Sequence, residues 1–156
     1  NLKNLISAFS KLNNQNVKLK VVGRVVKHLE SDTFLKHDNI DYLGNVSNDE
    51  LVDLYSNAKM LIFPSFYEGF GLPPLEAMSC GCPTIISDIP VLRELYEKAA
   101  LYINPYDSEN IKENILNLLG DPDMCNNLSE LGLKQANKYS WKKSADKIID
   151  LIKGLS

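Results

Sequence analysis

The chain has 156 residues, of which 44% are hydrophobic and 24% charged, as in ordinary globular domains and unlike disordered or membrane chains. This length suits a single domain with a sizeable core, and no apolar run approaches the about 20 residues of a membrane-spanning helix. The formal net charge of -3 gives no strong field for a polyanion, so nucleic acid is not expected as a partner.

Three cysteines cannot all pair within the chain, and the spacing of Cys80 and Cys82 is not that of a zinc site without a second pair or histidines elsewhere. Free thiols are therefore expected, and no metal site. No N-terminal signal segment is visible, so the cytoplasm is the expected location.

Hydrophobic periodicity divides the chain into alternating helices and strands. The first half predicts a helix at 2–12, a strand at 17–22, a partly helical stretch at 24–36, a strand at 39–46, a helix at 48–58 and a strand at 60–63. The last of these is a short continuous apolar run that ends at Pro64, which is typical of a strand buried on both faces of a parallel sheet.

The second half continues the alternation and then turns helical. It predicts a helix at 74–80, a strand at 83–87, a helix at 89–99, a strand at 100–104, and helices at 108–119, 122–138 and 141–153. Trp141 follows a helix-capping residue, Ser140, and is expected to pack the last helix against the core.

Strands that alternate with helices of about ten residues indicate βαβ units, and hence an α/β fold with a doubly wound, mostly parallel, Rossmann-like sheet. Such a domain normally opens with a strand, whereas this sequence opens with a helix. We therefore expect residues 1–156 to form one domain that lacks its first strand and belongs to a longer chain.

The segment "FPSFYEGFGLPPLEAMSCGCP", residues 63–83, holds two glycines and two adjacent prolines between Glu68 and Glu76. It follows a predicted strand, and ligands of open parallel sheets bind at the carboxyl ends of the strands. Gly69 and Gly71 permit positive φ and let backbone N–H groups approach a ligand closely. A proline then fits the first turn of the next helix, whose N-terminus favours an anion such as a diphosphate.

Two carboxylates beside an anion site would repel the anion unless they face hydroxyl groups. Carboxylates accept hydrogen bonds from vicinal hydroxyls, so Glu68 and Glu76 would each hold a polyol. A nucleoside diphosphate sugar, with two phosphates between a ribose and a hexose, has this plan. Taken singly, the residues have simpler interpretations: Glu76 compensates a helix dipole, the glycines form a turn, and Lys3 is a solvated surface residue.

The sequence "YEGFGLPPLEAMSCGCPTIISDIP" resembles the E-x7-E signature of the group 1 family of retaining glycosyltransferases, whose GT-B fold has two facing Rossmann-like domains. The segments "KNLISAF", "DNIDYLGNVSNDELVDLYSNAKMLIFPS" and "ALYINPYDSENI" stand in the order expected for this family, so the resemblance covers nearly the whole chain. It implies that the chain is the C-terminal, donor-binding half of a GT-B fold, without its N-terminal acceptor-binding domain.

The resemblance also implies roles for single residues. Glu76 would hold the ribose hydroxyls, Glu68 would contact the transferred sugar at the catalytic centre, and Lys3 would pair with the phosphates. The backbone of the glycine loop would meet the distal phosphate and the sugar at Gly69, Phe70, Gly71 and Leu72.

Loops after two other strands would receive the base, through Gly23, Arg24, Asn45 and Val46. By the same resemblance these are mainly backbone contacts that hide the identity of the base, so UDP, GDP and ADP sugars stay open as the substrate. No cofactor and no obligatory divalent metal are implied.

The expected function is transfer of a hexose from the nucleotide sugar to a glycan or lipid-linked acceptor, with retention of configuration, as in polysaccharide biosynthesis. The missing domain would supply any association with the cytoplasmic face of a membrane, and the fragment alone is expected to be inactive. Two alternatives stay open: a nucleotide-sugar-binding module without transfer activity of its own, and a nucleotide-sugar epimerase or phosphorylase of the same architecture.

Overall fold

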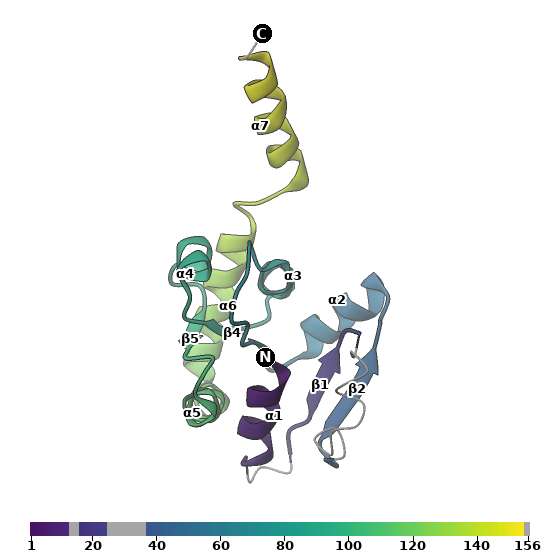
Figure 1. Cartoon of the computed structure of the whole chain (residues 1–156), viewed down its shortest axis with the longest axis vertical. Coiled ribbons are helices and arrows are strands. Elements are labelled where there is room, and N and C mark those ends of the chain that lie inside the picture. Colours follow the sequence, from purple (N-terminus) through teal and green to yellow (C-terminus); the bar gives the residue numbers. More distant parts are fainter. Residues whose placement is uncertain (13–15, 25–36, 155–156) are drawn as a thin grey trace.

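Two parallel sheets with helices beside them form the body of the domain (Figure 1). The computed structural model describes residues 1–12, 16–24 and 37–154. The first sheet pairs β1 (Leu19–Val22) with β2 (Ile40–Gly44), and the second has the order β3-β4-β5, from β3 (Leu61–Phe63), β4 (Thr84–Ser87) and β5 (Leu101–Ile103). Every pairing is parallel, and from β2 onward the described strands alternate with helices, which confirms the α/β, Rossmann-like expectation.

The helices fall where hydrophobic periodicity and capping residues predict them. They are α1 (Leu2–Ser10), α2 (Asn48–Asn57), α3 (Leu72–Ser79), α4 (Pro90–Tyr96), α5 (Ser108–Gly120), α6 (Pro122–Ala136) and α7 (Trp141–Lys153). The start of α2 is fixed by a capping box, in which Ser47 Oγ accepts from the Glu50 N–H at 3.3 Å and Glu50 Oε2 accepts from the Ser47 N–H at 2.7 Å. The side-chain carboxylates of Asp107 and Asp121 cap α5 and α6 by accepting from backbone N–H groups of the first turn. The stretch predicted as partly helical at 24–36 lies, from residue 25 on, outside the described residues.

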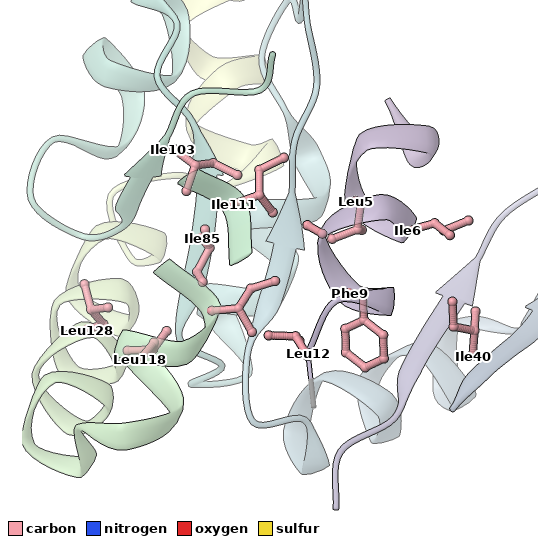
Figure 2. Packing of buried hydrophobic residues seen from close by; sticks show 12 residues of the cluster. Leu5, Ile6, Phe9, Leu12, Ile40, Ile85, Ile103, Ile111, Leu118 and Leu128 are labelled. Atoms are coloured by element: carbon pink, nitrogen blue, oxygen red, sulfur yellow. The ribbon is translucent and has the colours of Figure 1, made fainter. Parts of the chain in front are cut away.

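The apolar face of α1 joins the two sheets into one core. In Figure 2, Ile6 and Phe9 lie on the side of α1 toward Ile40 of β2, while Leu5 reaches the other way, toward Ile111 of α5. All five of these side chains are buried. A second cluster of buried side chains, around Met78, Ile86, Leu92 and Tyr96, packs α3 and α4 against the opposite face of β4 and β5. The two clusters together enclose β4, the central strand.

The strand β3 is not buried on both faces as its apolar run predicts. All residues of β4 are buried, whereas Leu61, Ile62 and Phe63 are only half-buried. The reason is a cavity of about 740 Å³ that lies between β1 and β3, lined by these two strands and by apolar side chains such as Leu5 and Phe9 of α1. The expectation of burial on both faces is therefore wrong for β3.

The last helix, α7, projects away from the body of the domain (Figure 1), and none of its residues is buried. Ser140 caps it as expected, but the Trp141 side chain is 82% exposed, so the prediction that Trp141 packs against the core is wrong. A cap is set by neighbouring residues, whereas packing needs a surface that none of the described elements supplies. Among the described residues, no helix is both long and apolar enough to cross a membrane.

Two neighbouring leucines of α5 test this assignment of the core. Leu118 is fully buried, whereas Leu116 is 44% exposed. Leu118→Ala should lower the free energy of unfolding by about 2–5 kcal/mol, because it removes buried methyl groups and leaves a void. Leu116→Ala, the matched control, should change it by less than about 0.5 kcal/mol. Urea denaturation measures both, and equal effects would contradict the packing described.

Candidate functional site

The loop at 64–71 leads from the carboxyl end of β3 into α3 and turns on Gly71. This residue has φ of +80°, and a Cβ built there would lie 2.9 Å from Leu92 Cδ2. The buried Tyr96 hydroxyl donates a hydrogen bond to the Gly71 carbonyl oxygen at 2.6 Å. Both the backbone conformation and the available space therefore require glycine at this position.

The turn leaves a row of backbone donors at the start of α3. Leu72 is the first helical residue, and Pro73 and Pro74, which follow it, carry no N–H. Within the described parts of the chain, nothing accepts a hydrogen bond from the N–H groups of Gly69, Phe70, Gly71 or Leu72. Unpaired N–H groups at a helix N-terminus suit an anionic ligand, because the helix dipole adds positive potential there.

The two glutamates lie on either side of this turn. Glu68 is half-buried in the loop, and Glu76 is exposed on α3, where it lines the cavity between β1 and β3. Burial and the neighbouring Tyr139 raise the pKa of Tyr96, and the carboxylates of Glu68 and Glu76 raise it further. Both carboxylates therefore act electrostatically on the hydroxyl that holds the Gly71 carbonyl.

Tyr55 of α2 is a neighbour of Glu76 that the sequence does not reveal. Burial raises the pKa of Tyr55 to about 12, and the Glu76 carboxylate is the next largest cause. Tyr55 and Glu76 line the same cavity. Because these residues are 21 positions apart and on different helices, only the folded chain shows that they meet.

The loops predicted to receive a base are joined to each other. The Gly23 N–H donates to the Gly44 carbonyl oxygen at 2.9 Å, and the Tyr42 hydroxyl donates to the Gly23 carbonyl. Gly23 and Arg24, at the end of β1, line the same cavity as Glu76. Asn45 and Val46 follow Gly44 directly but do not line it.

Lys3 lies on the exposed side of the first turn of α1, and it forms no ion pair with any described residue. The turn itself is held by two side-chain amides, since Asn1 Nδ2 and Asn4 Nδ2 donate to the Pro105 carbonyl oxygen at 2.6 and 2.9 Å. No direct hydrogen bond or ion pair connects Lys3 with the loop at 64–71.

The arrangement thus combines four unpaired N–H groups with two flanking carboxylates at the carboxyl end of β3. Such a site can bind an anion through the backbone and hydroxyl groups through the carboxylates. Among the described residues, no cluster of acidic, histidine or cysteine side chains could hold a metal ion. The three cysteines are free, with Cys82 buried and Cys80 and Cys125 half-buried.

Comparison with known proteins identifies the family. The model of "Glycosyl transferases group 1" matches residues 1–135. The O-antigen chain mannosyltransferase B of Escherichia coli is 41% identical over 114 residues, which are 73% of this chain and 30% of that protein. An uncharacterized glycosyltransferase of Methanocaldococcus jannaschii is 30% identical over 96% of this chain and 40% of its own length. The chain belongs to the group 1 glycosyltransferase family.

Solved structures share the fold at low sequence identity. The sucrose-phosphate synthase from Thermosynechococcus elongatus matches 99% of this chain with a TM-score of 0.85 and 24% identity, over 42% of its own chain. Anabaena HepE in complex with UDP-glucose matches 97% of this chain with a TM-score of 0.87 and 18% identity, over 44% of its own chain. The expected half of a GT-B fold is confirmed, and the chain spans less than half the length of each of these relatives.

Substitutions of the two loop glycines test whether the turn at Gly71 has the described geometry. Gly71→Ala should lower the free energy of unfolding by at least about 1–2 kcal/mol, the cost of a left-handed conformation for an L-residue, before any contact with Leu92 is counted. A Cβ at Gly69 meets nothing within 4 Å, and that residue has no positive φ. Gly69→Ala should leave the stability unchanged or raise it by up to about 1 kcal/mol. Chemical denaturation measures the free energy of unfolding of both variants. A Gly71→Ala protein as stable as wild type would refute the described geometry of the turn.

Proposed function

We propose that the chain is the donor-binding half of a retaining hexosyltransferase. It binds a nucleoside diphosphate sugar, with UDP, GDP or ADP as the nucleotide, and presents the sugar to a glycan or lipid-linked acceptor held by an N-terminal domain. A role in the synthesis of a polysaccharide fits the mannosyltransferases among its relatives, whose names refer to O-antigen chains. The chain on its own is inactive, because the acceptor domain is required.

The observation that carries the proposal is the row of unpaired N–H groups between two carboxylates. The N–H groups of Gly69 to Leu72 bind the diphosphate and the adjoining part of the sugar, since they have no partner among the described residues. Glu76 accepts from the ribose hydroxyls. Gly23, Arg24, Asn45 and Val46 surround the base.

The reaction breaks the bond between the anomeric carbon and the diphosphate oxygen and forms a bond between that carbon and a hydroxyl oxygen of the acceptor, whose proton leaves with the diphosphate. Negative charge grows on the departing diphosphate, and it is stabilised by the N-terminus of α3 and by the Lys3 ammonium group, which stand in place before the charge develops. Glu68 contacts hydroxyls of the transferred hexose at the catalytic centre. The same charges perform this stabilisation without a divalent metal.

The site of action is the cytoplasm or the cytoplasmic face of a membrane, which the acceptor domain contacts. This location would be contradicted by export of the full-length protein, as measured by cell fractionation.

The test of donor binding is calorimetry on the full-length protein with a panel of UDP, GDP and ADP sugars. Glu76→Ala should weaken the binding free energy of the preferred nucleotide sugar by about 1–3 kcal/mol, because the ribose hydroxyls lose their acceptor in a desolvated place. Glu113→Ala, an exposed glutamate of α5 outside the cavity, is the matched control and should bind as wild type. Equal affinity of the two variants would refute the role of Glu76, and binding without transfer would favour a binding module over an enzyme.

We also propose that a further strand, from the part of the full-length protein that precedes α1, fills the space between β1 and β3. Both strands border the cavity of about 740 Å³ along their length, and α1 packs across it. A helix that leads into β1 and a right-handed crossover place the preceding strand next to β1 in the same sheet. This strand would unite the two sheets and bury β3 on both faces.

Backbone alternation gives this second proposal its own test. Leu19 and Leu61 donate their N–H groups to Asn39 and Pro83, at 2.8 and 2.9 Å, so the neighbouring Lys20 and Ile62 direct theirs toward the cavity. In the full-length protein, single-residue hydrogen exchange should find all four amides protected. Rapid exchange at Lys20 and Ile62, with protection at Leu19 and Leu61, would show that no strand lies there.

A further inference from the structure

The short loop between β5 and α5, residues 104–107, contacts two distant segments that carry proposed donor-binding residues. Its Tyr106 ring stacks on the Phe66 ring, with centroids 4.7 Å apart and an angle of 24° between the planes. Phe66 lies two residues before Glu68. In the same loop, the Pro105 carbonyl oxygen accepts hydrogen bonds from the side-chain amides of Asn1 and Asn4, which stand before and after Lys3 in the sequence.

The loop is itself fixed by hydrogen bonds at both ends. Asn104 Oδ1 accepts from the Tyr106 N–H at 3.0 Å, and the Asn104 N–H donates to Asn110 Oδ1 at 2.9 Å. Asp107 Oδ1 accepts from the N–H groups of Glu109 and Asn110 and so caps α5. Tyr106 is therefore presented by a backbone that has little freedom of its own.

The loop that carries Glu68 is held unevenly. Its last two residues are fixed by the Tyr96 hydrogen bond to Gly71 and by an edge contact between Phe70 and Tyr139, with centroids 5.5 Å apart. Its first six residues, 64–69, form no hydrogen bond to any described residue. The stack of Phe66 on Tyr106 is the ring contact of this part of the loop.

We propose that Phe66 and Tyr106 are positioning residues, whose stacked rings set the place of Glu68 relative to Lys3. The Pro105 carbonyl holds the turn with Lys3, and the next residue in the chain holds the loop with Glu68. One loop thereby connects the group proposed to receive the charge of the departing diphosphate with the group proposed to contact the transferred sugar. The ligands of Glu68 and Lys3 rest on the proposed function, but the positioning of the loop does not.

A purely structural role for the stack fits the exposure of the rings poorly. Tyr106 is 71% exposed and Phe66 is 43% exposed, so the pair removes little apolar surface from water. The stack should consequently contribute much more to the placement of the loop than to the stability of the fold. Its removal would let the Glu68 carboxylate move away from the hydroxyls of the transferred hexose, and small displacements of that kind have large effects on rate.

The kinetic test uses the full-length enzyme with its preferred nucleotide sugar. Tyr106→Ala should lower kcat/KM at least about tenfold, mainly through kcat, with an unfolding midpoint close to that of wild type. Tyr106→Phe keeps the ring and should stay within about twofold of wild type. The double variant Phe66→Ala with Tyr106→Ala should be no slower than the worse single variant, because both changes break one contact. Additive losses, or a Tyr106→Ala enzyme with wild-type kinetics, would overturn the proposal.

A measurement without ligand separates this proposal from the proposed function. NMR order parameters of the backbone at residues 66–69 should be lower in Tyr106→Ala than in wild type and unchanged in Tyr106→Phe. If the wild-type protein binds no nucleotide sugar, the proposed function fails, and these order parameters still decide whether the stack positions the loop. Unchanged order parameters in Tyr106→Ala would refute the positioning role even if donor binding is established.

Discussion

The left-handed turn at Gly71 is the constraint on which the rest of the site depends. A side chain at this position would meet Leu92, and the carbonyl is held by the Tyr96 hydroxyl, so the chain has one way to pass from β3 into α3. That passage brings the helix N-terminus and its unpaired N–H groups to the carboxyl end of the strand. It also places one glutamate before the turn and one after it. The buried cluster around Tyr96 and Leu92 therefore supports the site as well as the fold.

The sequence predicts those features that neighbouring residues decide. The order of helices and strands is correct along the described chain, because hydrophobic periodicity, capping residues such as Ser47 and breakers such as Gly71 act locally. The glycine turn and the proline start of α3 were predictable for the same reason. Burial was less predictable: β3 is half-buried and Trp141 is exposed, since both depend on what lies beside them in space.

The site shows the same division. Glu68, Glu76 and the glycines between them form a local motif, and the sequence suffices to select them. Tyr55, Tyr96 and Tyr106 were missed, although each lies beside the motif in the folded chain. Each comes from a different element, and no spacing rule connects it with the loop at 64–71. A single tyrosine in a sequence carries no sign of which backbone carbonyl, carboxylate or ring it will meet.

The charges around the turn restrict the ligand more than its shape does. The N–H groups and the dipole of α3 attract an anion, but the carboxylates of Glu68 and Glu76 add negative charge before and after the turn, and both raise the pKa of Tyr96. A bare phosphate would gain from the first and lose to the second, because like charges repel strongly where water is excluded. A ligand whose phosphates are flanked by hydroxyls turns both carboxylates into acceptors. Under the proposed function, the same two carboxylates would therefore select against simple anions and in favour of a diphosphate with a sugar at each end.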